Sequence, residues 1–194
     1  MPGTRFGVRH MARRYALTGG AVMAVVLAAT PADAQAPPAA AQPAAQAPAR
    51  PPAPPPLLGA VTEADLRGYA PWQPYFATPY EPDAAAVGTI KAKARSVTVF
   101  SIVATWCPDS RREVPRFLAI MNAAGFPASA VTMIGVDRTK KDAEGLTEKW
   151  GITRVPTFVF LREGGEVGRV VERTPEGATL EAEIARILSG GQRD

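Results

Sequence analysis

The sequence predicts an α/β domain in which helices flank a central mixed sheet, with an extension at its N-terminus. Three observations lead to this prediction. Residues 97–103 and 131–136 are apolar, β-branched runs, typical of strands that are covered on both faces. Residues 108–124 lie between them and carry apolar side chains at helical spacing, so the two strands are expected to run parallel. Residues 157–171 contain two further apolar runs around a Gly-Gly pair, which predicts an antiparallel hairpin.

Local signals mark where the helices begin and end. A first helix is expected over residues 84–94, after a proline and an acidic residue that suit a helix start. Pro108 suits the first position of the second helix, because the amide that proline lacks would have no partner there. Gly125 suits the C-cap of the same helix. Two further helices are expected, over residues 140–150 and 179–188, and the last of them closes the domain.

The start of the chain is typical of a secretory signal peptide. Four arginines precede an apolar stretch, and Ala32-Asp33-Ala34 has the small-residue pattern of a cleavage site. The apolar stretch is too short to span a bilayer, which needs ~20 residues, although an uncleaved anchor is the alternative interpretation. We therefore expect an exported protein, periplasmic or extracellular, that contacts the membrane only if the signal peptide, residues 1–34, is retained.

Two segments of unusual composition follow this leader. Residues 35–56 consist mostly of Ala, Pro and Gln, which cannot bury a core, so a disordered spacer or a Pro-rich ligand is expected. Residues 57–83 are rich in aromatic residues and proline. They are expected either to form a strap that buries its rings against the domain, or to form a docking patch for a partner. The domain itself is expected over residues 84–194.

Charge and residue counts exclude several classes of function. The formal net charge is +4, but the leader supplies +3 of it through four arginines and one aspartate, so nucleic-acid binding is not expected. The one histidine, His10, lies in the leader, which excludes Ser-His-Asp and Cys-His hydrolases. It also argues against a metal site or a haem, so no cofactor is expected. The one cysteine, Cys107, cannot form an internal disulfide, so it is expected to be a reactive thiol or an intermolecular partner.

The single cysteine lies where a strand is expected to end and a helix to begin. Cys107 follows Trp106 and precedes Pro108, which places it at the N-terminus of the helix. Unpaired amides and the positive end of the helix dipole favour a thiolate over a thiol at this place. The nearby Arg111 and Arg112 either add to this effect or are ordinary exposed charges. An inert buried cysteine is the alternative interpretation.

Four features of this part of the chain resemble the thioredoxin superfamily. The letters W-C-P-D-S at residues 106–110 fit the family's W-C-x-x-C motif except in the last residue, and Pro115 stands where the family kinks its active-site helix. The letters V-P-T at residues 155–157 look like the family's cis-proline segment, and a hairpin and a last helix follow them. The resemblance covers roughly residues 84–190 and implies a thioredoxin-like fold.

The resemblance also implies which residues form the site. Cys107 would be the nucleophile, and Ser110 would lie close enough to donate a hydrogen bond to its thiolate. Pro156 would follow a cis peptide bond and face the cysteine, while the backbone of Val155 would offer an edge to an extended substrate peptide. The expected substrate-binding residues are Trp106, Pro108, Val155 and Pro156.

The chain departs from the family's pattern at two positions. Ser110 replaces the second, resolving cysteine, so Cys107 could start a thiol–disulfide exchange but not release itself within the chain. Ser101 stands six residues before Cys107, where many thioredoxins hold a buried acid that moves protons during release. Both departures fit a monothiol protein, with the motif C-x-x-S, that depends on an external thiol.

Three functions are compatible with these residues. The first is thiol–disulfide exchange through Cys107, with protein or low-molecular-weight thiols and disulfides as partners and an external thiol that resolves the intermediate. The second is a thioredoxin-fold module that binds a peptide or a protein and has no redox activity. The third is a dimer linked by a disulfide between two copies of Cys107.

Overall fold

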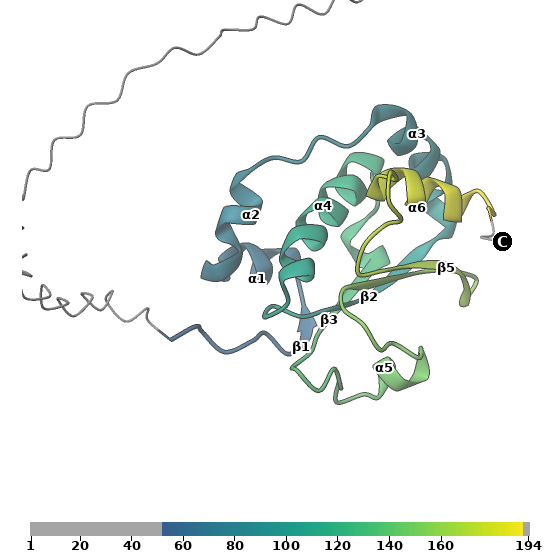
Figure 1. The fold of residues 1–194 in the computed structure, drawn as a ribbon. Helices are drawn as coiled ribbons and strands as arrows, with labels where there is room; N and C mark the ends of the chain where they lie inside the picture. The colour runs from purple at the N-terminus through teal and green to yellow at the C-terminus, as the bar shows by residue number, and fades with distance from the viewer. Residues whose placement is uncertain (1–51, 192–194) are drawn as a thin grey trace, which may run out of the picture. The chain divides into compact units, whose positions relative to one another are not determined.

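The computed structural model of the 194-residue chain describes residues 52–191 (Figure 1). The expected signal peptide, residues 1–34, and most of the expected linker, residues 35–56, lie outside the described residues. In the described part of the chain, no helix is long and apolar enough to cross a membrane.

A five-stranded mixed sheet forms the centre of the domain. Its strands are β1 (Gly59–Val61), β2 (Thr98–Val103), β3 (Val131–Gly135), β4 (Thr157–Arg162) and β5 (Gly165–Val171). They lie in the order β1-β3-β2-β4-β5. β2 and β3 are parallel, because a helix crosses between them, and the other neighbours pair antiparallel. The predicted mixed sheet, with its parallel pair and its hairpin, is confirmed.

Helices cover both faces of this sheet. They are α1 (Glu63–Gly68), α2 (Gln73–Ala77), α3 (Ala84–Lys93), α4 (Pro108–Ala124), α5 (Leu146–Lys149) and α6 (Leu180–Leu188), with short 3-10 turns at Ala70–Trp72, Ala94–Ser96 and Ala128–Ala130. α3, α4 and α6 lie on one face with the larger apolar core, which includes Ile90, Phe117 and Ile184. α5 lies on the opposite face, where a smaller core surrounds Ile102 and Val159 (Figure 1).

Helix α4 follows β2, and its two ends obey the sequence signals. Pro108 occupies the first turn, as expected for a residue without an amide hydrogen. Gly125 adopts a left-handed conformation (φ 74°) at the C-cap and donates its amide to the carbonyl of Asn122 (3.1 Å). The helix continues through Pro115. The predicted helix over residues 108–124 is therefore confirmed.

The helix expected over residues 140–150 is wrong in its length, because only Leu146–Lys149 are helical. The carboxylate of Asp142 accepts the amides of Leu146 (2.9 Å) and Thr147 (2.7 Å), and therefore satisfies the first turn from outside the helix. Gly145 adopts a left-handed conformation (φ 69°) directly before the helix. The carboxylate of Asp142 thus takes the place of the backbone carbonyls that an earlier helical turn would have offered to these amides.

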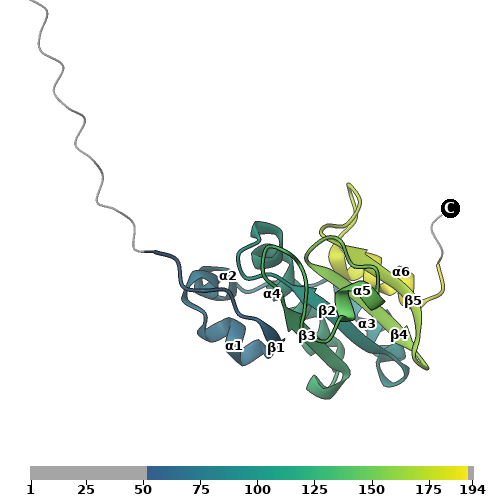
Figure 2. The same cartoon turned by 90° about the horizontal axis from the view of Figure 1, so that it is seen from below.

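The N-terminal segment, residues 57–83, is built into the fold and is more than a strap on its surface. β1 adds an antiparallel edge strand beside β3, and Trp72 is fully buried in the larger core. α1 and α2 lie beside α4 in both views (Figures 1 and 2), and the side chain of Asn122, near the end of α4, donates to Glu63 of α1 (3.2 Å). Tyr75 remains 42% exposed. A strand of three residues is too short to show a period of two, so β1 left no signal in the sequence.

A hydrogen-bonded carboxylate joins the end of this segment to the last helix. The hydroxyl of Tyr80 donates to Glu181 (2.8 Å), and the amide of Asp83 donates to the same carboxylate (3.1 Å). Burial and the adjoining carboxylate of Glu181 raise the pKa of Tyr80 to about 12. The segment is therefore attached to the domain at both of its ends, by β1 and by Tyr80.

Candidate functional site

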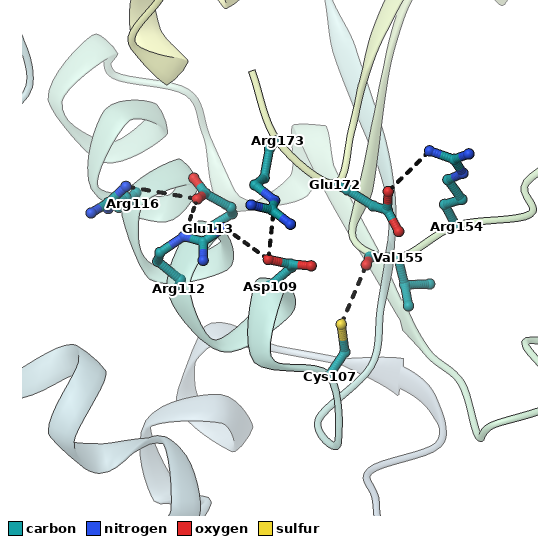
Figure 3. Close-up of polar contacts among 9 residues, drawn as sticks. All are labelled: Cys107, Asp109, Arg112, Glu113, Arg116, Arg154, Val155, Glu172 and Arg173. Atoms are coloured by element: carbon teal, nitrogen blue, oxygen red, sulfur yellow. Dashed lines mark hydrogen bonds and ion pairs between the residues drawn. The ribbon is translucent and has the colours of Figure 1, made fainter. Parts of the chain in front are cut away.

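Cys107 lies at the junction between β2 and α4, as the sequence predicts. It is the N-cap residue of α4, and its amide donates to the carbonyl of Ala104 (3.0 Å), which closes a tight turn. Its thiol donates to the carbonyl of Val155 (3.4 Å), so the sulfur faces the loop before β4 (Figure 3). The residue is only 7% exposed and belongs to the smaller core. The fold thus brings together two sites that are 48 residues apart in the sequence.

The loop that faces the thiol is built around Pro156, and the Val155–Pro156 peptide bond is cis. The hydroxyl of Thr157 donates to the carbonyl of Arg154 (2.7 Å) at the start of this loop. The amide of Glu172 donates to the carbonyl of Pro156 (2.7 Å) from the end of β5. These two bonds hold the loop from both sides, with the Val155 carbonyl directed at the sulfur (Figure 3).

Ser110 has a different partner from the one that the sequence interpretation expected. Its side chain is fully buried, and its hydroxyl oxygen accepts the amide of Ala104 (3.3 Å). Among the hydrogen bonds of the described residues, none joins Ser110 to Cys107. The amide of Ala104 is buried at the end of β2 and needs an acceptor, which the serine six residues later supplies. In this structure Ser110 therefore supports the turn and not the sulfur.

Trp106 and Pro108 flank the cysteine, and the ring of Trp106 is held in place from two sides. Its indole nitrogen donates to the carbonyl of Val136 (3.0 Å). The guanidinium of Arg138 lies 4.9 Å from the centroid of the ring, within range of a cation–π interaction. Pro108 is exposed, and Trp106 is half-buried. Both residues are thus placed to contact a molecule that approaches the sulfur.

The two arginines that follow the cysteine differ in what they contact. Arg111 donates to the carbonyls of Thr105 (3.3 Å) and Trp106 (3.2 Å), so its positive charge lies against the turn that carries the cysteine. Arg112 instead pairs with the carboxylate of Asp109 (2.8 Å) on the surface of α4 (Figure 3). Arg111 therefore lies against the turn that carries the cysteine, whereas Arg112 is engaged in ion pairs along α4.

Two contacts from the N-terminal segment reach the same turn, and no sequence motif pointed to them. The indole nitrogen of Trp72 donates to the carbonyl of Thr105 (3.0 Å). The amide of Leu57 donates to the hydroxyl of Thr105 (3.1 Å). A buried tryptophan usually finds an acceptor for its N–H, but its partner could not be read from the sequence.

A comparison with protein families gives a match to the thioredoxin family over residues 87–186, about half of the chain. The chain belongs to the thioredoxin family. The thioredoxin match begins after the N-terminal segment, so Leu57 and Trp72 lie outside the matched range. The expectation of a thioredoxin-like fold is confirmed.

Individual relatives agree with this assignment. A thioredoxin H-type protein of Oryza sativa subsp. indica is 34% identical over 82 residues, which cover 42% of this chain and 62% of that protein. Thioredoxin H4 of Arabidopsis thaliana is 31% identical over 98 residues, which cover 50% of this chain and 76% of that protein. The chain thus spans less than two thirds of the rice relative's length.

A likeness to a solved structure supports the fold alone. A protein of unknown function from Pseudomonas aeruginosa has a TM-score of 0.51 to this chain, with 16% sequence identity. The superposition covers 68% of this chain and 91% of that chain.

In this thioredoxin-family domain, Ser101 stands where the family often holds a buried acid. The side chain is fully buried in β2, and its hydroxyl has no hydrogen-bond partner among the described residues. Val99 and Val103, on the same face of the strand, belong to the larger core beneath α4. The hydroxyl of Ser101 is therefore an unpaired polar group in an apolar layer, whereas the hydroxyl of the equally buried Ser110 accepts a hydrogen bond.

The two buried serines are expected to respond oppositely to replacement by alanine. Ser101→Ala should raise the free energy of unfolding by about 1 kcal/mol, because it removes an unpaired buried hydroxyl. Ser110→Ala should lower it by about 1 kcal/mol, because the amide of Ala104 loses its acceptor. Urea unfolding of the three proteins measures both changes. Equal shifts of the same sign in the two variants would contradict the assignment of partners.

The thioredoxin domain offers no evident place for a metal ion in its described residues. No group of three or more His, Cys, Asp or Glu side chains in residues 52–191 is arranged to hold one.

Proposed function

We propose that this protein is an exported thioredoxin-family protein that exchanges thiols and disulfides through the single sulfur of Cys107. The observation that supports this best is the position of that sulfur, at the N-terminus of α4 and 3.4 Å from the carbonyl that precedes Pro156. The first amides of a helix have no partners within it and stabilise a negative charge at its N-terminus. The thiolate is the nucleophile in thiol–disulfide exchange, and the sulfur of Cys107 lies at such a helix end.

The first step of the proposed reaction is attack by this thiolate on a substrate disulfide. A new S–S bond forms between Cys107 and one substrate sulfur, while the S–S bond within the substrate breaks. The other substrate sulfur leaves as a thiolate and takes a proton from water. The result is a mixed disulfide between the protein and its substrate.

The second step needs a thiol from outside the chain, because position 110 carries a hydroxyl and Cys107 is the only cysteine. The external thiolate attacks the substrate sulfur of the mixed disulfide and forms a new S–S bond with it. The bond between the substrate and Cys107 breaks, and the thiolate of Cys107 is restored. Over both steps, the protein passes a substrate sulfur from one thiol to another and undergoes no net oxidation.

The rim of the site fits an extended segment that contains the reacting sulfur. The backbone of Val155 lies in a loop ahead of β4, beside the sulfur, and it would pair with the backbone of a substrate peptide. Trp106, Pro108 and Pro156 would contact the substrate's side chains. We therefore propose protein or low-molecular-weight thiols and disulfides as partners, without a bound cofactor.

An exported location forms part of the proposal, because it rests on the composition of residues 1–34. Expression of the full chain in a bacterium, followed by fractionation, is expected to recover the protein in the periplasm with the leader removed. Recovery of an intact leader in the cytoplasm would contradict export and leave the exchange chemistry to be judged by its own test.

The exchange itself is tested with oxidised glutathione and a fluorescent peptide thiol. The wild-type protein is expected to gain one glutathionyl group by intact mass, to lose it when the peptide thiol is added, and to accelerate formation of the peptide–glutathione disulfide. Cys107→Ser should do none of these. Peptide binding that persists in Cys107→Ser, without any adduct in the wild type, would instead support a redox-inactive binding module. A dimer that disappears on reduction would support the Cys107-linked dimer.

A further inference from the structure

Three hydrogen bonds converge on Thr105, two residues before the reactive cysteine. Its carbonyl accepts from the indole of Trp72 (3.0 Å) and from Arg111 (3.3 Å), and its hydroxyl accepts from the amide of Leu57 (3.1 Å). Thr105 is 1% exposed and Trp72 is completely buried. Both N-terminal donors come from far along the chain, 33 and 48 residues away. The segment therefore contacts the turn through one buried and one part-buried hydrogen bond.

The N-terminal donors are themselves held firmly. Leu57 directly precedes the part of the chain that enters β1, which pairs with β3 from Gly59 opposite Gly135. The carbonyl of Leu57 lies so close to Gly135 that a Cβ at that glycine would be 2.3 Å from it. The ring of Trp72 contacts that of Phe76 in the larger core, with 6.5 Å between the ring centroids. Neither donor can move away from Thr105 without disturbing the sheet or the core.

We propose that the N-terminal segment positions the reactive turn, with Trp72 and Thr105 as the residues through which it acts. The proposal rests on the proposed function of Cys107 and deepens it. The position of the sulfur depends on the short turn from Ala104 to Cys107, since the amide of the cysteine bonds to the carbonyl of Ala104. Thr105 is the residue of that turn to which both Leu57 and Trp72 of the N-terminal segment donate. The segment thus completes a site that the family-matched range, residues 87–186, does not complete alone.

The hydrogen bonds from Trp72 and Leu57 to Thr105 matter to the proposed reaction because it depends on where the sulfur of Cys107 lies. Exchange needs a second sulfur to approach the sulfur of Cys107, which the turn holds at the start of α4 and beside Val155. A misplacement of about 1 Å can slow an oriented reaction by as much as 100-fold. A turn that has lost one of its buried hydrogen bonds visits such misplaced conformations more often.

The test uses the full chain and two pairs of variants. Trp72→Phe removes the indole donor to Thr105 and keeps an aromatic ring, whereas Tyr80→Phe removes a donor of the same segment whose partner is Glu181 and not Thr105. Thr105→Val keeps the shape of the side chain but leaves the amide of Leu57 without its acceptor, whereas Thr105→Ser retains the hydroxyl. The rate of Cys107 alkylation by iodoacetamide and the rate of exchange with oxidised glutathione are measured for each, together with the melting temperature.

Both rates are expected to fall about five-fold or more in Trp72→Phe and in Thr105→Val, as for the loss of one buried hydrogen bond. They should stay within about two-fold of the wild type in Tyr80→Phe and Thr105→Ser. Unchanged or higher rates in Trp72→Phe and Thr105→Val would overturn the proposal. Rates that fall equally in Tyr80→Phe, in proportion to the fall in its melting temperature, would overturn it as well. If Trp72→Phe does not fold, the two Thr105 variants decide alone.

Alkylation also separates this inference from the proposed function, because it needs no disulfide partner. Suppose that the wild-type protein exchanges no disulfides, but that Cys107 is alkylated more slowly in Trp72→Phe and Thr105→Val than in the wild type. This result would overturn only the proposed function and would support the positioning role.

Discussion

Replacing Ser110 by cysteine is expected to raise disulfide-reductase turnover with an external reductant by about 100-fold or more. The second sulfur would resolve the mixed disulfide within the chain, and well-oriented intramolecular reactions have very high effective concentrations. Cys107 is the N-cap of α4 and residue 110 follows it by one turn, a spacing at which side chains are neighbours. Helical Cα atoms three residues apart are also close enough for a disulfide. Reduction of insulin, followed by turbidity, measures the gain.

Two matched variants show whether the gain comes from the new sulfur. Ser110→Ala loses the same hydrogen bond to Ala104 but adds no thiol, so it should show no gain. The double variant Cys107→Ser with Ser110→Cys should be inactive, because residue 110 is completely buried and cannot start the exchange. If Ser110→Cys forms the disulfide, seen by intact mass, and still does not turn over, the scaffold is not a competent thiol exchanger and the proposed function fails.

Gly135→Ala is expected to lower the free energy of unfolding by about 3 kcal/mol, a large effect for one methyl group. The added Cβ would lie 2.3 Å from the carbonyl oxygen of Leu57 and 2.9 Å from a methyl of Val61. Because the first of these contacts is with backbone, a change of rotamer cannot relieve it. β1 must therefore shift away from β3, and the amide of Leu57 must leave Thr105. Chemical unfolding measures the loss of stability.

Gly88→Ala is the matched control, since a Cβ at this position of α3 meets nothing within 4 Å. Alanine is the better helix former, so this variant should gain about 0.5–1 kcal/mol. Slower alkylation of Cys107 is expected in Gly135→Ala and not in Gly88→Ala. A Gly135→Ala protein as stable as the wild type would show that the carbonyl of Leu57 lies farther from Gly135 than in this structure.

A single sulfur changes what the fold can do. In the pattern with two cysteines, the protein itself accepts the oxidation, whereas under the proposed function every cycle would end on a thiol supplied by another molecule. The buried polar groups near the site also differ from those of the two-cysteine pattern. Ser110 is bonded to the backbone of the turn, and Ser101 leaves a polar atom without a partner where an acid would move protons. In the proposed reaction, both positions would affect the release step and not the first, bond-forming step.

Much of the fold could be predicted from the sequence because its signals are local. β2 and α4 were predicted from apolar periods, a proline and a glycine, all of which act within a few residues. The position of Cys107 followed directly, because it lies between the two elements. α5 was predicted too long, since the carboxylate of Asp142 competes for amides that the apolar spacing assigned to a helix. Local propensity fails where a side chain offers the backbone another partner.

The sequence by itself determined the order of the strands and helices from α3 to α6 and the place of the single proposed nucleophile before a helix, because these depend on neighbours in the chain. Only the tertiary structure decided which distant groups meet that nucleophile. The carbonyl of Val155, 48 residues away, and the indole of Trp72, which bonds to Thr105, reach the turn because the sheet brings them there. Ser110 turns to Ala104 for the same reason, since buried backbone amides must find acceptors in whatever space the packing leaves.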